Sequence, residues 1–292
     1  MSLIAGFEHI VRENEPLAPF TRLKLGGVAE YFAEPTNVNE LIGLLQRFSQ
    51  KDLPIRLIGS GSNVLIRNGG VPGLVLRLSA PDFCQIEIED QTLTAGGGTQ
   101  LSHFVASAVR EGFAGPEQLV GMTGTVGAAL YYNTGSSGSD MGSWIESVDL
   151  ISRTGERTTK KSNELSFSYR QSSITELVVL KAQFKFERES PEILTKQMQK
   201  RWIVRRSSQP GWDENATFIF KDHGGESAES LIDQAGLKGT RIGGVAISER
   251  NSNYFVADAN ATCEDVLRLI DLVKTTVRDR LEIELEEALT IW

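Results

Sequence analysis

Apolar side chains recur along the first half of the chain with two different spacings. Residues 39–48 repeat leucine and phenylalanine at helical intervals, which predicts an amphipathic helix. A second helix is predicted over residues 100–111, where Gly112 would end it. Continuous or alternating apolar runs predict strands at 54–59, 63–66, 74–78, 84–89, 92–96, 145–151 and 176–187. Short helices mixed with many strands are typical of the α+β class.

The pattern becomes mainly helical after Glu189. Helices are predicted at 190–209, where Pro210 would end a basic helix, at 228–237 and at 262–281. The last of these would begin at Asn260 or Thr262, and its acidic side chains precede its basic ones, as the helix dipole favours. We therefore expect a domain boundary between about 188 and 212. Residues 1–188 would form one domain in two lobes, about 1–80 and 81–188, and residues 189–292 would form a smaller one.

Composition and charge narrow the classes of partner. Hydrophobic residues make up 40% of the chain and charged residues 23%, which is ordinary for a globular protein. The formal net charge of −8, with no long basic run, argues against a nucleic-acid partner. No apolar run approaches the ~20 residues that cross a bilayer, and the first residues lack the pattern of a signal peptide. We expect neither nucleic acid nor membrane as a partner.

Cysteine and histidine are sparse and scattered. Cys84 and Cys263 show no metal-type spacing and do not define a disulfide framework, which favours a reducing cytoplasm. The histidines, His9, His103 and His223, lie far apart in the sequence. We therefore expect no metal site.

Residues 59–63, Gly-Ser-Gly-Ser-Asn, separate two apolar strand-like runs. Gly59 and Gly61 can take positive φ and let the backbone approach a ligand closely. Consecutive exposed amides in such a turn form a concavity that holds anions, and the serine and asparagine side chains add short donors. Two interpretations stay open: a cradle for a phosphate or pyrophosphate, and a tight turn between strands.

A second glycine-rich segment, residues 121–133, repeats this chemistry. The side chains after Gly124 are typical of a helix start, and N–H groups at a helix N-terminus attract anions. Two such loops favour an extended ligand with two phosphates and a flat body. The spacing does not match the dinucleotide fingerprint, so another fold would bind the nucleotide. The expected cofactor-binding residues are Gly59, Ser60, Gly61, Ser62, Asn63, Gly121, Thr123, Gly124, Thr125, Gly127, Ala128, Asn133 and Gly138.

Further motifs, taken in order, carry a resemblance over nearly the entire chain. They are FTRLKLGGVAEYFAEP (20–35), LIGSGSNVLI (57–66), GMTGTVGAALYYNTGSSG (121–138), FSYRQS (167–172), RRSSQP (205–210) and GESAESLIDQAGLKGTRIGG (225–244). Together they resemble the UDP-N-acetylenolpyruvoylglucosamine reductase (MurB) family, in its compact form without long insertions.

The resemblance implies a two-lobed FAD-binding domain of the vanillyl-alcohol-oxidase type and a smaller α+β domain that binds a UDP-sugar. It also implies a reaction in which NADPH reduces FAD and the enolpyruvyl ether becomes UDP-N-acetylmuramate. Arg170 would face the substrate carboxylate, because a guanidinium can bind a carboxylate through two hydrogen bonds. Tyr169, Arg206 and Lys221 would bind substrate. The residues alone favour a surface arginine at Arg170, and Arg206 could equally be part of a basic helix face.

The sequence departs from the family pattern at two positions. The family carries a serine proton donor in a G-S-x-F-K-N-P-like turn, and the corresponding stretch here places Phe218 at the serine. A one-residue bulge would instead bring Thr217 there as a replacement donor. The glutamate of the family's C-terminal strand falls on Ala288, and Glu286 or Glu287 would need a change of register to replace it.

These departures leave three interpretations open. The chain could be a working reductase whose proton comes from Thr217, Asp222, His223 or a water. It could be an FAD oxidoreductase for another substrate. It could also be a non-catalytic relative that binds FAD or a UDP-sugar as a partner or sensor module. In each case we expect a cytoplasmic monomer or weak homodimer.

Overall fold

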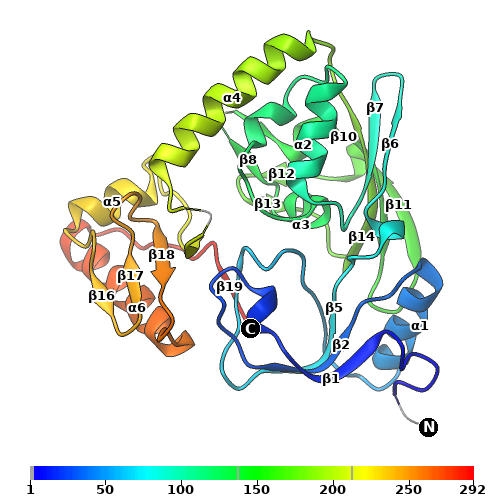
Figure 1. Cartoon of the computed structure of the whole chain (residues 1–292), viewed down its shortest axis with the longest axis horizontal. Helices are drawn as coiled ribbons and strands as arrows, with labels where there is room; N and C mark the ends of the chain where they lie inside the picture. Colours follow the sequence, from blue (N-terminus) through cyan, green and yellow to red (C-terminus); the bar gives the residue numbers. More distant parts are fainter. Residues whose placement is uncertain (1–2, 137, 212) are drawn as a thin grey trace. The chain divides into compact units, whose positions relative to one another are not determined.

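A computed structural model describes residues 3–136, 138–211 and 213–292, and contacts divide the chain into two compact units (Figure 1). Unit 1 comprises Met1–Glu15, Ala29–Ser60 and Pro72–Ile203. Unit 2 comprises Pro16–Val28, Gly61–Val71 and Val204–Trp292. The chain therefore contributes twice to unit 2 before its C-terminal part completes that unit.

The first sheet of unit 1 has the strand order β1-β2-β5-β3. These strands are β1 (Val11–Pro16), β2 (Val28–Ala33), β5 (Val71–Leu76) and β3 (Ile55–Leu57). Helix α1 (Val38–Ser49) buries the leucines and the phenylalanine of the predicted helical stripe in the core beside this sheet. Asn37 caps the helix by accepting a hydrogen bond from the N–H of Glu40. The helix predicted over 39–48 is confirmed.

The second sheet of unit 1 is antiparallel, with the order β11-β10-β14-β7-β6. Its strands are β11 (Arg157–Lys161), β10 (Ile145–Ile151), β14 (Val178–Lys185), β7 (Thr92–Gly96) and β6 (Ile86–Glu89). Helices α2 (Leu101–Arg110) and α3 (Val126–Tyr131) lie beside it in Figure 1. They share a core with the sheet, in which the rings of Phe104 and Phe184 meet edge to face.

Two short hairpins and a long helix complete the chain up to residue 208. The hairpins pair β8 (Gly135–Ser136) with β9 (Ser139–Asp140), and β12 (Phe167–Ser168) with β13 (Gln171–Ser172). Helix α4 (Pro191–Ser208) carries the basic residues predicted there and ends before Pro210. Its last residues, 204–208, are grouped with unit 2.

Unit 2 is built on a sheet with the order β15-β18-β17-β16. Its strands and helices are β15 (Asn215–Phe218), β18 (Tyr254–Ala257), β17 (Val245–Ile247), β16 (Arg241–Ile242), α5 (Ala228–Gln234) and α6 (Cys263–Leu281). Thr262 caps α6 through a capping box with Asp265, so the start expected at Asn260 or Thr262 is found at Thr262. The apolar face of α6 is buried in the core of this unit.

The strands on the two sides of residues 59–63 belong to different sheets. β3 ends at Leu57 beside β5 in unit 1. β4 (Val64–Leu65) instead pairs in parallel with β19 (Thr290–Ile291) in unit 2. The glycine-serine segment therefore carries the chain from one sheet to another and does not close a hairpin.

The two compact units do not coincide with the two domains expected from the sequence, a cofactor-binding domain and a substrate-binding domain. The division into residues 1–188 and 189–292 stays a prediction about which residues bind which ligand. The compact units add that 16–28 and 61–71 group with the C-terminal residues. Their apolar side chains explain this, because Leu23 and Leu65 are buried in the core formed with α5 and α6.

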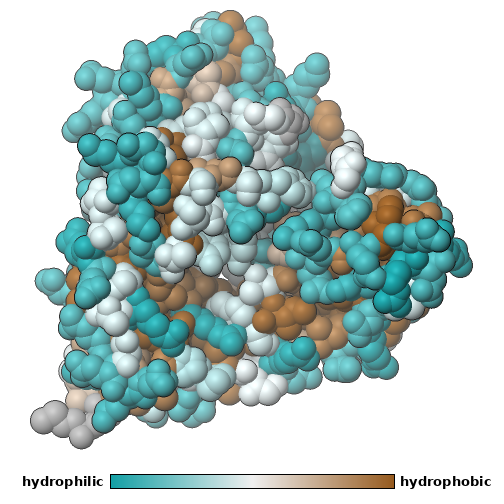
Figure 2. All heavy atoms as spheres, turned by 180° about the vertical axis from the view of Figure 1, so that it is seen from behind, coloured by the Kyte–Doolittle hydropathy of each residue, from teal (hydrophilic) through white to brown (hydrophobic). Residues whose placement is uncertain are grey.

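Hydrophilic residues cover much of the face shown in Figure 2, with apolar patches between them. In the part of the chain that the structure describes, no helix is long and apolar enough to cross a membrane. Within residues 3–136, 138–211 and 213–292 there is also no group of three or more histidine, cysteine, aspartate or glutamate side chains that could hold a metal ion.

Candidate functional site

The two glycine-rich loops meet in unit 1. A Cβ atom added to Gly59 would lie 2.9 Å from Oγ1 of Thr125 and 3.7 Å from Cβ of Ala128. The hydroxyl of Ser60 donates a hydrogen bond to Oε1 of Gln100 at 3.0 Å. Glycine at 59 is therefore required by close packing of the first loop against the start of α3. The sequence predicted that these segments serve one ligand, and the structure places Gly59 and Thr125 side by side.

The start of α3 is already hydrogen-bonded within the chain. The N–H of Val126 donates to Thr99 O at 2.8 Å, and the N–H of Gly127 donates to Gly97 O at 2.9 Å. The N–H of Ala128 donates to Oγ1 of Thr125, which caps the helix. The free amides expected at this helix start are thus occupied. Donors for an anion in this segment would have to come from the residues before Val126.

The remaining residues of the first loop lie in unit 2. Gly61 has φ +62°, and a Cβ atom there would lie 1.9 Å from Phe20 O, so only glycine fits. Asn63 donates through Nδ2 to Ala288 O at 2.9 Å. Its Oδ1 atom is buried and has no hydrogen-bond partner among the residues that the structure describes. A buried acceptor without a donor is costly, which points to a donor supplied by a ligand.

Asn133 is buried and its side chain is fully engaged by the protein. Nδ2 donates to Asp140 Oδ2 at 3.0 Å and to Ser168 O at 2.9 Å, while Oδ1 accepts from the N–H of Gly142 at 2.9 Å. These bonds tie two hairpins of unit 1 together. A cofactor contact by Asn133, which stays a prediction, would have to use its backbone. Gly138, with φ +91°, has open space around its Cα.

Tyr169 and Arg170 form the tip of the β12–β13 hairpin. Arg170 has φ +57°, a conformation that is uncommon for a residue with a side chain. Its guanidinium carbon lies 5.9 Å from the centre of the Tyr169 ring, and 58% of Tyr169 is exposed. The turn therefore displays an arginine and an aromatic ring together. The role of both in substrate binding stays a prediction.

Thr217 lies on β15 and is 3% exposed. Its hydroxyl donates to Ser62 O at 2.7 Å, so its proton is held by the first loop. Phe218, the next residue, is half-buried, and its ring lies 6.3 Å from that of Tyr254. Thr217 can deliver a proton to a ligand only if its hydroxyl leaves the Ser62 carbonyl, and this role stays a prediction.

The C-terminal segment runs beside residues 219–221. The N–H of Ala288 donates to Ile219 O at 2.7 Å, so the position that falls on the family's glutamate is bonded to the residue after Phe218. The carboxylate of Glu286 lies 3.1 Å from Nζ of Lys221, and that of Glu287 lies 2.7 Å from Nζ of Lys274. Both candidate replacement glutamates are therefore engaged in ion pairs.

Three other residues with a predicted role, Arg206, Asp222 and His223, differ in their contacts. Asp222 accepts the N–H of Ala228 at 3.0 Å and so supports the start of α5. His223 exchanges backbone hydrogen bonds with Glu226 in a glycine turn. Arg206 is exposed near the end of α4. Its contact with substrate stays a prediction.

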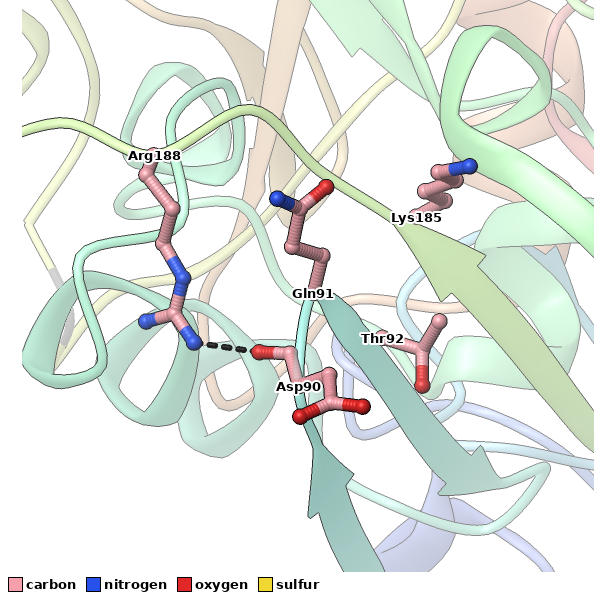
Figure 3. Close-up of a pocket in the computed structure, with 5 residues that line it drawn as sticks. All are labelled: Asp90, Gln91, Thr92, Lys185 and Arg188. Carbon is pink, nitrogen blue, oxygen red and sulfur yellow. Dashed lines mark hydrogen bonds between the residues drawn. The ribbon is translucent and has the colours of Figure 1, made fainter.

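A surface depression in unit 1 is lined by other residues: Asp90, Gln91, Thr92, Lys185 and Arg188 (Figure 3). Arg188 donates to Asp90 O and to Glu111 O, and its guanidinium lies over the Phe113 ring. The arginine is therefore occupied in holding the β6–β7 turn. None of the predicted site residues lines this depression, and we assign it no role.

Sequence reasoning missed the surroundings of Arg22. This residue stands in the quoted motif FTRLKLGG but was given no role. In the structure its Nε donates to Ala216 O at 3.3 Å, next to Thr217. A sequence carries no signal for such a contact, because the two residues are separated by most of the chain.

The loops fit a flavin dinucleotide. Neither 59–63 nor 121–128 contains a carboxylate that would repel a diphosphate. Gly59 and Gly61 leave no room for a side chain, and Asn63 offers a buried acceptor that lacks a donor. A family model described as "FAD binding domain" matches residues 29–160. The chain is therefore a flavoprotein with an α+β fold.

A second family model, described as "UDP-N-acetylenolpyruvoylglucosamine reductase, C-terminal domain", matches residues 209–292. A UDP-N-acetylenolpyruvoylglucosamine reductase of Rhodopirellula baltica is 39% identical over 284 residues, which cover 97% of this chain and 93% of the relative. The enzyme of that name from Bacillus subtilis is 34% identical, covering 96% and 93%. The chain belongs to the UDP-N-acetylenolpyruvoylglucosamine reductase (MurB) family.

A solved structure supports the same conclusion. The crystal structure of UDP-N-acetylenolpyruvylglucosamine reductase (MurB) from Thermus caldophilus aligns with a TM-score of 0.81 and 30% sequence identity. The alignment covers 97% of this chain and 98% of that one. The resemblance inferred from the sequence motifs, and the fold class that it implied, are confirmed.

Proposed function

We propose that this chain reduces UDP-N-acetylenolpyruvoylglucosamine to UDP-N-acetylmuramate, a step of peptidoglycan precursor synthesis, with FAD as cofactor and NADPH as electron donor. The family membership over nearly the whole chain is the observation that carries this proposal. When bound, FAD supplies the hydride that the reaction needs, after taking one from NADPH. Backbone and hydroxyl donors of residues 59–63 and 121–125 would hold its diphosphate, and Gly127 and Ala128 would line the site through the start of α3.

The protein's own part in the reaction is to stabilise charge and to provide a proton. Hydride addition to the enolpyruvyl group builds negative charge near its carboxylate, and a fixed cation lowers the energy of that state. Arg170 would provide this cation on its hairpin, with Tyr169 beside it. Arg206 and Lys221 would bind the substrate.

The proton donor is the least conventional part of the site. Phe218 and Ala288 stand where the family pattern has a serine and a glutamate, and neither can donate a proton. Thr217 carries a hydroxyl next to Phe218 on the same strand. We propose that this hydroxyl, released from Ser62 O, protonates the substrate.

The test is an anaerobic assay in two steps. NADPH added to the FAD-loaded protein should bleach the flavin absorbance band. The enolpyruvyl UDP-sugar added next should restore that band, and UDP-N-acetylmuramate should form. A flavin that NADPH bleaches but that this substrate does not reoxidise would overturn the proposed reaction and leave the flavoprotein assignment intact.

We propose that the chain works in the cytoplasm as a monomer or weak homodimer. Cys84 and Cys263 are both free, which suits a reducing compartment. Burial raises the pKa of each thiol above its ordinary value, which keeps both in the unreactive protonated form. Sedimentation at several protein concentrations would test the oligomeric state.

A further inference from the structure

The backbone around Arg22, in unit 2, is fixed by buried neighbours and hydrogen bonds. Its neighbours Thr21 and Leu23 are each 2% exposed. The Thr21 hydroxyl is bonded to Leu25 O at 2.8 Å, and the N–H of Arg22 donates to Gly61 O at 2.9 Å. The backbone of Arg22 is therefore fixed by contacts on both sides, and its side chain starts from a defined position.

The guanidinium of Arg22 has no carboxylate partner in the described part of the chain. Its Nε donates to the carbonyl oxygen of Ala216, on β15. The residue is half-buried, and a partly buried charge is costly unless an opposite charge or hydrogen bonds compensate it. Of the guanidinium N–H groups, only that of Nε has a partner among residues 3–136, 138–211 and 213–292.

The surroundings of Arg22 are poor in negative charge. Residues 59–63 and 215–221 contain no aspartate or glutamate, and the one lysine among them, Lys221, is paired with Glu286. Strand β15 also carries the Thr217 hydroxyl, bonded to Ser62 O. A cation held beside hydroxyl and backbone groups, with no carboxylate, is suited to an oxyanion from outside the protein.

We infer that Arg22 binds an oxyanion of the nucleotide-sugar ligand. This inference rests on the proposed function. The ligand offers two such groups, the carboxylate of its enolpyruvyl ether and its diphosphate. Both accept paired hydrogen bonds from a guanidinium, whose planar fork matches two oxygens of one group. Arg22 would then be a specificity-determining residue in addition to Arg170.

The test compares two ligands by calorimetric titration of the FAD-loaded protein without NADPH. UDP-N-acetylenolpyruvoylglucosamine carries both oxyanions, whereas UDP-N-acetylglucosamine carries only the diphosphate. Arg22→Gln removes the charge but keeps an amide that can donate to Ala216 O. Loss of a charged hydrogen bond should weaken binding about 10-fold to 100-fold. Arg22→Lys keeps the charge without the fork and should lose less affinity.

Arg241→Gln serves as a matched control. Arg241 lies in the same unit, on β16, and its Nη1 is 2.8 Å from a carboxylate oxygen of Asp258. Its charge is therefore already compensated within the protein, and its loss should leave both affinities unchanged. Thermal unfolding of each variant checks the fold. If Arg22→Gln fails to fold, Arg22→Lys gives the comparison.

The outcomes separate the sources of the oxyanion. Weaker binding of the enolpyruvyl ligand alone supports an Arg22–carboxylate contact, and equal weakening of both ligands supports a diphosphate contact. Unchanged affinities for both ligands overturn the inference, as does a loss of FAD affinity alone. A native protein that binds neither nucleotide sugar overturns the proposed function, and this inference with it.

Discussion

Unit 1 and unit 2 offer a ligand different kinds of contact. In unit 1 the glycine loops pack closely, and polar side chains such as Asn133 are bonded to the protein itself. At these loops, close approach of the backbone is what remains for a ligand, and side-chain chemistry in unit 1 would come from the Tyr169–Arg170 turn. In unit 2, by contrast, β15 carries the hydroxyl of Thr217, and the side chain of Arg22 donates a hydrogen bond to the same strand. Cofactor binding and substrate chemistry should therefore respond to different substitutions, and each prediction below tests that separation.

Arg170 is the charge of unit 1 that we expect to act on the substrate. Arg170→Gln should lower kcat about 10²-fold to 10³-fold, because stabilisation of the developing charge is lost. FAD affinity, measured by flavin absorbance titration, should not change. Arg157→Gln, an exposed arginine on β11, is the control and should leave both quantities unchanged. If Arg170→Gln lost FAD affinity by as large a factor as kcat, cofactor binding and substrate chemistry would not depend on different residues.

Thr217 tests the same separation in unit 2. Thr217→Val should lower kcat about 10²-fold, at the lower end for a general acid, because the hydroxyl is shared with Ser62 O. It should also lower the free energy of unfolding by about 1–3 kcal/mol, since the Ser62 carbonyl loses its donor. Thr217→Ser keeps a hydroxyl, so both kcat and the free energy of unfolding should stay close to those of the native protein. If Thr217→Val is destabilised but keeps its kcat, then Thr217 is structural and the proton comes from another group.

Gly59 tests the backbone contacts of unit 1. Gly59→Val adds side-chain atoms where even a Cβ would lie 2.9 Å from Oγ1 of Thr125, so the loops must separate. Such overpacking costs about 1–3 kcal/mol, and FAD affinity should fall about tenfold. Gly69→Ala is the control, because no atom lies within 4 Å of a Cβ at Gly69. Equal FAD affinities in the two variants would show that the loops do not hold the cofactor.

Substitution of Glu34 has the smallest expected effect, and the quantity that it changes is the stability of the fold. Burial would raise the pKa of Glu34, but its hydrogen bonds with Ser79 and Arg12 and the charge of Arg77 outweigh this and lower the pKa below 4.5. The stabilisation is present above pH 4.5 and is lost as the pH falls through the lower folded-state pKa.

The acid response should be confined to unit 1. Glu34→Gln should remove up to about 1 kcal/mol of stability at neutral pH and flatten the acid response. Hydrogen exchange in β2 and β5, followed from neutral to acid pH, measures this change. Exchange in β17 and β18 should be the same in the native protein and the variant. A difference there would show that the two units unfold together.

The helices were predictable from sequence because their signals are local. Helical spacing and end signals within a few residues predicted 39–48 and 100–111, and the structure has α1 at Val38–Ser49 and α2 at Leu101–Arg110. Strand pairing was not predictable in this way. Nothing near β4 indicates that it pairs with β19 at the other end of the chain.

The candidate site was predictable in its composition but not in its hydrogen bonds. The glycine-rich composition of the two loops predicted a close approach of backbone to a ligand, and the structure shows that Gly59 also leaves room for the side chain of Thr125. The sequence could not show that the N–H of Gly127 is bonded to Gly97 O. Nor could it show that no carboxylate among the described residues pairs with Arg22, since that depends on which distant segments fold beside this arginine.

The pairing of β4 with β19 has a consequence for how the protein is made. Residues 61–71 leave the ribosome long before Thr290 and Ile291 are synthesised. The edge of β4 must therefore stay without this partner while all the residues between them are made. Synthesis of β19, rather than emergence of β4, should set the moment at which unit 2 becomes resistant to proteases in the cell.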